Sequence, residues 1–302
     1  MAITVSCNSS RLVSLDEFID YVHTNVDLHD QDSVLAAAPM FQCIANDREL
    51  VVRQLNRQVK NQFKSQNVPS AQVLYLGEGK NFYLRANIWP SNADIASGRV
   101  YQDQFAYNLG HDHNYDFMTV AYHGPGYITD IYEYDFDKLE GRVGEQVDFR
   151  FLEHAHFTKG MVMMYRASKD VHIQFPPEDL SITLNFMVST QEVRLRDQFF
   201  FDMNSKTLLD YPAELDGSRR ISVLKMAAEV GNGDTQQMLH DLSLRHPCRR
   251  TRLAAFESLA RLDPVNATQV WESACRDREP LVVHTARGQL DALAAVRQPT
   301  RN

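Results

Sequence analysis

Between residues 71 and 200 the chain is a succession of short β-rich segments separated by turn residues. Segments of this kind, bounded by Gly, Pro, Asn or Asp, are typical of a β-sandwich or a β-barrel. Residues 73–90 predict a hairpin, and Gly124, Pro125 and Gly126 interrupt the middle of the region. The pattern therefore predicts that this part of the chain folds as an all-β domain.

Two of these segments, residues 82–89 and 181–188, alternate apolar side chains with a mixed polar set. Because successive side chains of a strand point to opposite faces, each segment has one apolar face and one mixed face. A mixed face either meets solvent or, in a small barrel, lines a ligand cavity. The mixed faces carry Tyr83, Arg85, Asn87 and Trp89 in the first segment, and Ser181, Thr183, Asn185 and Met187 in the second.

Helical patterns flank the β-region on both sides. Ser14 and Glu17 form the signature of a capping box, and apolar residues at helical spacing predict helix from residue 14 to about residue 65. Similar helical sequences begin at residues 221, 252 and 284, a spacing near 31 residues, which is typical of stacked helical hairpins and resembles degenerate HEAT repeats. These C-terminal helices either cap the barrel, contact a second copy in a homodimer or bind a protein partner.

These patterns predict an α+β chain in three parts. Residues 1–66 form an N-terminal helical segment, residues 67–205 a β-barrel domain, and residues 206–302 a helical region of HEAT-like repeats. The chain has 302 residues, of which 44% are hydrophobic, and this is enough apolar material to fill a core.

Composition excludes several classes of partner. The net charge is −8, and no block of Lys or Arg could neutralise a run of phosphates, so we expect no nucleic acid partner. No apolar run reaches the roughly 20 residues that cross a bilayer, and the N-terminus lacks the apolar core of a signal peptide, so we expect no membrane partner and a cytoplasmic location. The four cysteines are widely separated, which favours reduced structural thiols.

The segment GHDHNYDF, residues 110–117, carries the strongest chemical signal. His111 and His113, two residues apart on a strand, project to the same side and can supply two adjacent ligands to a divalent transition metal. Such pairs also occur by chance. His154 and His156 form a second pair, which we expect either to orient the site or to lie outside it.

The residues around His111 and His113 resemble the two sequence motifs of the cupin superfamily. The first motif continues with an acidic ligand and then a glycine, and here Phe117 stands at the acidic position and Gly124 at that of the glycine. The second motif begins with a glycine and ends in a third histidine. Gly160 and His172 match it to within one residue, and the resemblance extends over about residues 75–190.

This resemblance implies a cupin-type β-barrel, or jelly roll, with His111, His113 and His172 as metal ligands. Asp116 could replace the missing acidic ligand only if a β-bulge turned it inward, because alternation from His111 points Asp116 outward. We therefore expect a neutral three-histidine site with Asp116 in reserve.

Three imidazoles leave open positions on one face of an octahedral ion, a geometry that suits non-haem iron(II), although nickel, copper and zinc bind the same ligands. Within the cupins, a three-histidine set resembles the cysteine dioxygenases and the ring- or diketone-cleaving dioxygenases. The resemblance implies an oxygenase that uses iron(II) and dioxygen. The chain has no cysteine between residues 44 and 247, so the crosslinking cysteine of the thiol dioxygenases is absent, and a thiol substrate is not implied.

The remaining candidates are side chains that are predicted to point inward from their strands. Arg85 either binds a substrate carboxylate through both guanidinium nitrogens or meets solvent, and Tyr83, Thr183 and Asn185 are the other candidate substrate contacts. Tyr107 and Tyr115 either donate a proton near the metal or pack in the core. The predicted substrate is a small, carboxylate-bearing, amino-acid-like molecule.

Two other functions fit the same pattern. The protein could be a metal-dependent cupin isomerase or lyase, in which zinc, nickel or manganese acts as a Lewis acid. It could also be a ligand sensor without catalytic activity, whose C-terminal helices contact another protein.

Overall fold

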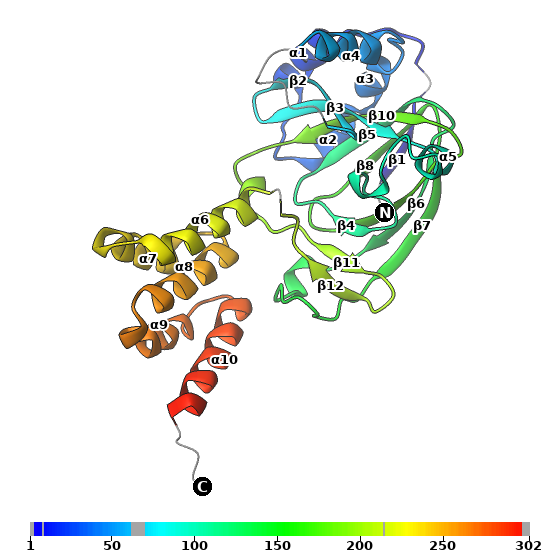
Figure 1. Cartoon of the computed structure of the whole chain (residues 1–302). Helices are drawn as coiled ribbons and strands as arrows, with labels where there is room; N and C mark the ends of the chain where they lie inside the picture. The colour runs from blue at the N-terminus through cyan, green and yellow to red at the C-terminus, as the bar shows by residue number, and fades with distance from the viewer. Residues whose placement is uncertain (1–2, 8, 62–69, 214, 298–302) are drawn as a thin grey trace. The chain divides into compact units, whose positions relative to one another are not determined.

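The computed structural model describes residues 3–7, 9–61, 70–213 and 215–297, which form two compact units (Figure 1). The first unit contains the chain up to residue 136 together with residues 147–193 and 200–206. The second contains residues 137–146, 194–199 and the chain from residue 207 onward. The predicted division into three parts stays a prediction, and its boundary between residues 66 and 67 lies outside the described residues.

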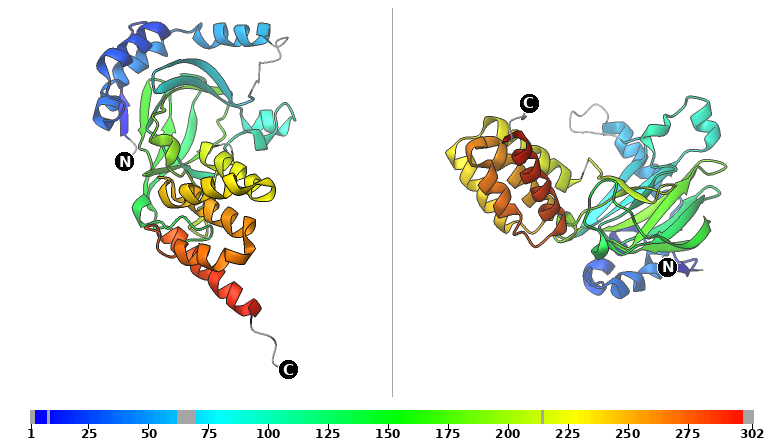
Figure 2. Two further views of the ribbon diagram at one scale, coloured as in Figure 1. Left: turned by 90° about the vertical axis from the view of Figure 1, so that its left-hand side faces the viewer. Right: turned by 90° about the horizontal axis from the view of Figure 1, so that it is seen from below.

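Two antiparallel sheets form the centre of the first unit (Figure 2). The first sheet has the order β1 (Ile3–Ser6), β8 (Met161–Tyr165), β5 (Phe117–His123), β10 (Ser181–Val188), β3 (Phe82–Trp89) and β2 (Val73–Gly79). Within this unit the second sheet has the order β11 (Phe200–Asp202), β4 (Gly110–Asp112), β9 (Asp170–Phe175), β6 (Tyr127–Glu133) and β7 (Arg150–Phe157). The chain is therefore a mixed helical and antiparallel β protein, and the closure of these sheets into a barrel stays a prediction.

The inner faces of the two sheets enclose one apolar cluster. Trp89 of β3 and Phe117 of β5 come from the first sheet, while Tyr127 and Ile131 of β6 come from the second. Because the side-chain period of a strand is two, the mixed faces predicted for β3 and β10 meet this interior, not solvent. The interior therefore contains polar groups as well as apolar ones.

The outer face of the first sheet packs against N-terminal helices (Figure 1). Phe82, Leu84 and Phe186 belong to this second cluster together with Phe18 and Phe41 from the helices. The helices are α1 (Leu15–Asn25), α2 (Gln31–Ala36), α3 (Ala38–Ile44) and α4 (Leu50–Lys60), and α5 (Asn92–Ala96) follows β3.

The predicted capping box begins α1, but the long helix predicted after it is wrong. The Ser14 hydroxyl accepts a hydrogen bond from the Glu17 backbone nitrogen, and the Glu17 carboxylate accepts one from Ser14. The chain is extended again at Asp30, whose side chain caps α2. A separate helix begins at Ala38, and Pro39 fits in its first turn because the N–H that proline lacks has no partner within the helix there. Residues 62–65 of the predicted helix lie outside the described residues.

The second unit is built mainly of helices. Leu224, Leu239 and Ala255 form one apolar cluster, and Phe256 and Trp271 belong to another. Both clusters include residues of α8, so this helix packs against the helices that precede it in the chain and against those that follow it. The elements are β12 (Thr207–Asp210), α6 (Asp216–Val230), α7 (Gly233–Arg245), α8 (Arg249–Leu262), α9 (Ala267–Ala274) and α10 (Pro280–Arg297). Their assignment as HEAT-like repeats stays a prediction.

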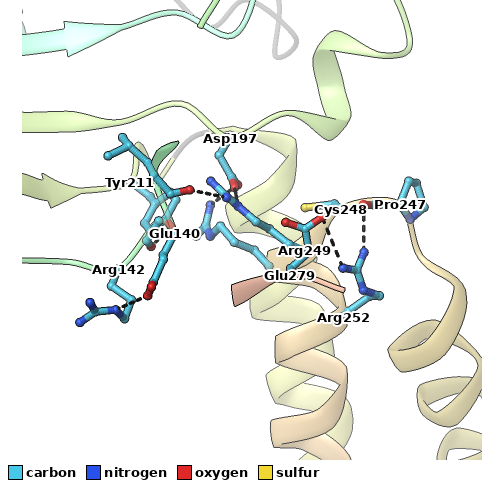
Figure 3. A network of polar contacts seen from close by, with 12 residues as sticks. Glu140, Arg142, Asp197, Tyr211, Pro247, Cys248, Arg249, Arg252 and Glu279 are labelled. Carbon is cyan, nitrogen blue, oxygen red and sulfur yellow. Dashed lines mark hydrogen bonds and ion pairs between the residues drawn. The ribbon is translucent and has the colours of Figure 1, made fainter. Parts of the chain in front are cut away.

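Two arginines near the start of α8 connect this unit internally (Figure 3). Arg249 donates to Asp197 at 3.0 Å and to the Leu139 carbonyl at 2.9 Å. Arg252 is 2% exposed and donates hydrogen bonds to both carboxylate oxygens of Asp277, at 2.7 and 2.8 Å.

Among the described helices of the chain, none is long and apolar enough to cross a bilayer.

Candidate metal centre

The structure brings the three predicted histidine ligands together. His111 lies on β4, His113 follows the end of that strand, and His172 lies on β9 directly opposite His111 in the β4–β9 pair. The Nε2 atom of His172 is 3.0 Å from Nε2 of His111 and 3.1 Å from Nε2 of His113. All three side chains are buried, and their candidate ligand atoms lie within 4.8 Å of one another.

These distances suit a bound metal ion. Two nitrogens at about 2.1 Å from an ion and at a right angle to each other are about 3.0 Å apart. Nδ1 of His111 lies 2.9 Å from the Leu109 carbonyl oxygen, so this nitrogen carries the ring proton and Nε2 keeps its lone pair. A cation at the point where the Nε2 atoms converge would offset the repulsion between such lone pairs.

The electrostatic environment keeps the imidazoles in the form that binds metals. The pKa of His111 is lowered to about 4, chiefly by burial, while the hydrogen bond to the Leu109 carbonyl opposes the shift and the positive charge of Arg85 adds to it. Burial also lowers the pKa of His172 well below its usual value, and His111 and His113 add to this effect. At neutral pH both rings are therefore neutral, which is the state that coordinates a metal.

The Asp116 carboxylate makes contacts in another direction. Its Oδ1 accepts hydrogen bonds from the Gln31 side chain at 2.9 Å and from the Ala167 backbone nitrogen at 2.7 Å. The ring of His113, in contrast, lies 4.9 Å from that of Tyr115 and 4.8 Å from that of Phe117. The side chains therefore alternate as predicted, even though β4 ends at Asp112 and β5 begins only at Phe117.

Aromatic rings surround Phe117, which stands at the position of the acidic ligand in the cupin motif that the sequence resembles. The Phe117 ring is parallel to that of Tyr165, with 4.7 Å between centroids and 10° between planes. The Tyr165 ring lies 4.4 Å from that of His172. We did not single out Tyr165 from the sequence, although alternation along residues 161–165 would have placed it on the same face as Met161 and Met163.

Of the predicted substrate contacts, Arg85 is best placed for that role. It lies on the inner face of β3, close enough for its charge to lower the pKa of His111 and to act on the phenol of Tyr115. Its Nε atom is buried and has no hydrogen-bond partner among the described residues. Tyr83 points to the same side of β3 and packs against the inner cluster.

Thr183 and Asn185 are partly engaged within the protein. The Thr183 hydroxyl accepts a hydrogen bond from Trp89 Nε1 at 3.1 Å and donates one to Asn185 Oδ1 at 3.1 Å. Both residues are at least 96% buried, with 1% and 4% exposure. Asn185 is the cross-strand partner of Arg85, so the two side chains are neighbours on the inner face.

The two candidate catalytic tyrosines have different environments. The Tyr107 hydroxyl donates to the Pro90 carbonyl at 2.8 Å and its ring packs on Trp89, which are the contacts of a core tyrosine. Tyr115 instead contacts the His113 ring, and burial raises the pKa of its phenol. The Tyr115 hydroxyl therefore keeps its proton at neutral pH and can donate it.

The second histidine pair lies outside the site. His154 and His156 are exposed on β7, and Nδ1 of His154 is 2.5 Å from the Asp130 carboxylate. The sequence left open whether this pair orients the site or lies outside it, and the structure favours the second position.

Comparison with known proteins adds little to this geometry. No family model matches the chain, and no curated protein matches it. A structure of the DMSP lyases RdDddP and RnDddQII has a TM-score of 0.24 and 10% identity, over 42% of this chain and 50% of that one. Hydroquinone 1,2-dioxygenase from Sphingomonas sp. TTNP3 has a TM-score of 0.26 and 10% identity, over 41% and 68%.

The DMSP lyase DddQ from Ruegeria pomeroyi DSS-3 has a TM-score of 0.22 and 10% identity, over 40% of this chain and 49% of that one. The chain thus matches about half the length of the two lyase structures. Because these TM-scores are low, the interpretation of the site rests on its own geometry.

Proposed function

We propose that the protein is a cupin-type, iron(II)-dependent oxygenase that acts with dioxygen on a small carboxylate-bearing molecule. The observation that carries this proposal is the convergence of three buried imidazole Nε2 atoms, with His172 at 3.0 and 3.1 Å from the other two. His111, His113 and His172 would hold the ion. When bound, iron(II) would supply the electrons that activate dioxygen.

The charge of the site favours an anionic substrate. Three neutral imidazoles leave the charge of a divalent ion uncompensated. The carboxylates of Asp116 and Asp112, which are close in sequence to the histidines, accept hydrogen bonds from other residues. Asp116 accepts from Gln31 and Ala167, and Asp112 accepts from the Tyr134 hydroxyl at 2.6 Å. The Arg85 guanidinium adds a further positive charge and can bind a carboxylate through two parallel hydrogen bonds.

The surrounding side chains would orient the substrate and exclude water. Phe117 and Tyr165 present ring faces and edges beside His113 and His172, which leaves little room for bulk water there. The protonated Tyr115 phenol, in ring contact with His113, would donate a proton or a hydrogen bond to the substrate.

Metal analysis of protein purified without chelators tests the proposal. We expect stoichiometric iron, loss of that iron in His111→Ala and His113→Ala, and retention in the matched surface variant His154→Ala. Oxygen consumption with small carboxylates then tests the reaction. Folded wild-type protein that takes up no iron would rule the proposal out.

A metal-dependent isomerase or lyase is the second candidate, because neutral histidine ligands with an open position also suit zinc as a Lewis acid. The same metal analysis separates the two. Zinc or nickel in place of iron, together with turnover that consumes no oxygen, supports the second candidate.

A further inference from the structure

Three side chains on the inner face of the first sheet form a directed chain of hydrogen bonds. The Trp89 indole N–H donates to the Thr183 hydroxyl at 3.1 Å, and this hydroxyl donates to Asn185 Oδ1 at 3.1 Å. Trp89, Thr183 and Asn185 are 3%, 1% and 4% exposed. Bulk water therefore does not compete for these contacts.

The first member of this chain sets its direction. An indole N–H can only donate, so the Thr183 oxygen is the acceptor of that hydrogen bond. The hydroxyl proton of Thr183 then needs an acceptor, and among the described residues its partner is Asn185 Oδ1. Because hydrogen bonds distinguish the oxygen and nitrogen ends of a carboxamide, this contact determines the orientation of the Asn185 amide.

The nitrogen end of this amide remains available for a ligand. Among the described residues, Asn185 Nδ2 makes no hydrogen bond. The cross-strand neighbours of Asn185 on the inner face are Arg85 of β3 and Thr119 of β5. Arg85 has donors only, and its buried Nε also has no partner among the described residues. The Thr119 hydroxyl does not accept a hydrogen bond from Asn185 either.

Asn185 and Arg85 therefore present N–H donors side by side. The Cβ atoms of directly opposed residues in antiparallel strands are about 4.5–5.5 Å apart, so the two side chains can reach one ligand group. The charge of Arg85 acts on His111, which places this pair of donors beside the candidate metal centre. A ligand that binds both donors must offer acceptors at the same place.

A carboxylate meets this requirement and a carboxamide does not. Both carboxylate oxygens accept hydrogen bonds, whereas a carboxamide has one oxygen and an NH₂ group that donates. With its oxygen at Arg85, the NH₂ of a carboxamide would face the Asn185 donor, and both groups would be left buried without a partner.

We propose that Asn185 determines the specificity of the site for a carboxylate. Its Nδ2 donates to the same substrate carboxylate that Arg85 binds, and the corresponding carboxamide is excluded. Trp89 and Thr183 are positioning residues, because they hold the amide oxygen of Asn185 away from the ligand. The identity of the ligand as a substrate rests on the proposed function. The preference for a carboxylate is a property of the inner face and can be measured without metal.

NMR titration of metal-free, full-length protein with matched ligands tests the proposal. The pairs are propionate with propionamide and benzoate with benzamide, and the Asn185 side-chain NH₂ signals are identified by their loss in Asn185→Asp. We expect the wild type to bind at least one carboxylate about tenfold or more tightly than its amide, with a shift of those signals.

Asn185→Asp should invert this preference. The new carboxylate still accepts from Thr183 but presents an acceptor to the ligand and repels its charge. The affinity for the carboxylate should therefore fall about tenfold or more, while the affinity for the amide rises. A role in stability alone would weaken the binding of both ligands.

Thr183→Val tests the positioning role and keeps the proposal testable if Asn185→Asp does not fold. It retains the side-chain shape but removes the hydroxyl, so the Asn185 amide can turn its oxygen toward the ligand. The preference for the carboxylate should then fall several-fold. Gln198→Glu is the matched control, because it makes the same change from amide to carboxylate at a buried residue of the second unit. It should leave both affinities unchanged.

Three results would overturn the proposal. They are equal affinities of the wild type for the two members of each pair, parallel losses of both ligands in Asn185→Asp, and a wild type that binds none of the four compounds. Iron uptake is measured separately. Protein that takes up no iron but shows the expected preference contradicts the proposed function and supports the role of Asn185.

Discussion

At the scale of single residues, Phe117 places an uncharged ring beside a candidate metal ligand. Its ring lies 4.8 Å from that of His113, at the position where the cupin motif has an acidic ligand. We predict that Phe117→Glu raises the affinity for a divalent metal at least about tenfold, because a carboxylate would offset part of the ion's charge. Chelator competition measures this change.

Phe117→Gln is the matched control, since it has similar polarity and no charge. Without metal, the glutamate variant should melt at a lower temperature than the control, and added metal should restore it. Equal metal affinities of the two variants would show that residue 117 does not face the ion.

Arg85 is predicted to bind the substrate carboxylate. Arg85→Lys should weaken the binding of small carboxylates to metal-loaded protein about tenfold or more, since an ammonium cannot form the two parallel hydrogen bonds of a guanidinium. Titration calorimetry measures the affinity, and Arg99→Lys, which alters an exposed arginine, serves as the control. Unchanged affinity in Arg85→Lys would place the carboxylate elsewhere.

The buried histidines also make stability depend on pH. The pKa of His111 is about 4 in the folded chain, whereas an unfolded histidine has a pKa of about 6.5. Between these values the unfolded state binds a proton that the folded state does not, so the free energy of unfolding falls as the pH falls. The stabilisation is complete above about pH 6.5 and is lost progressively toward pH 4.

We expect His111 alone to contribute a slope of up to about 1.4 kcal/mol per pH unit in metal-free protein. Urea unfolding at several pH values measures it, and His111→Asn should reduce the slope. An identical pH dependence in this variant would mean that His111 is already charged in the folded state.

At the scale of elements, alternation predicted the faces of β3 and β10 correctly. Apolar Leu84 and Phe186 lie in the cluster with the N-terminal helices, and Trp89 and Met187 lie in the inner cluster. Alternation is a local property of an extended backbone, so it can be read from a short segment. The pairing that makes Arg85 a neighbour of Asn185 is not local, and the sequence did not indicate it.

The helix α8 depends on a buried ion pair. Arg252 is 2% exposed, and it binds Asp277 as well as the carbonyl oxygens of His246 and Pro247. We predict that Arg252→Met destabilises the second unit by about 3–5 kcal/mol, because it leaves the Asp277 carboxylate buried without its partner.

Urea unfolding followed by the fluorescence of Trp271, which packs against this helix region, measures the loss. Arg261→Met is the matched control on the same helix. Arg261 pairs with Glu229 at the surface, so its loss should cost at most about 1 kcal/mol. Equal effects of the two substitutions would contradict a structural role for the buried pair.

At the scale of the whole molecule, the first unit combines segments that are far apart in the sequence. His113 and His172 are separated by 59 residues, yet their Nε2 atoms are 3.1 Å apart. The strand pair β4–β9 brings these two parts of the chain together. Closing such long loops costs chain entropy that only the assembled core can offset.

The sequence by itself determined the local features: the capping box at Ser14, the strand faces, and the His111–His113 pair with its outward-pointing Asp116. Each depends on backbone geometry within a few residues. The resemblance of the sequence also indicated His172 as the third ligand, whereas the tertiary structure decided that its ring meets those of His111 and His113 and that Tyr107 packs in the core. Both outcomes join segments that are distant in the sequence, so the packing of the entire unit determines them and no short segment contains both partners.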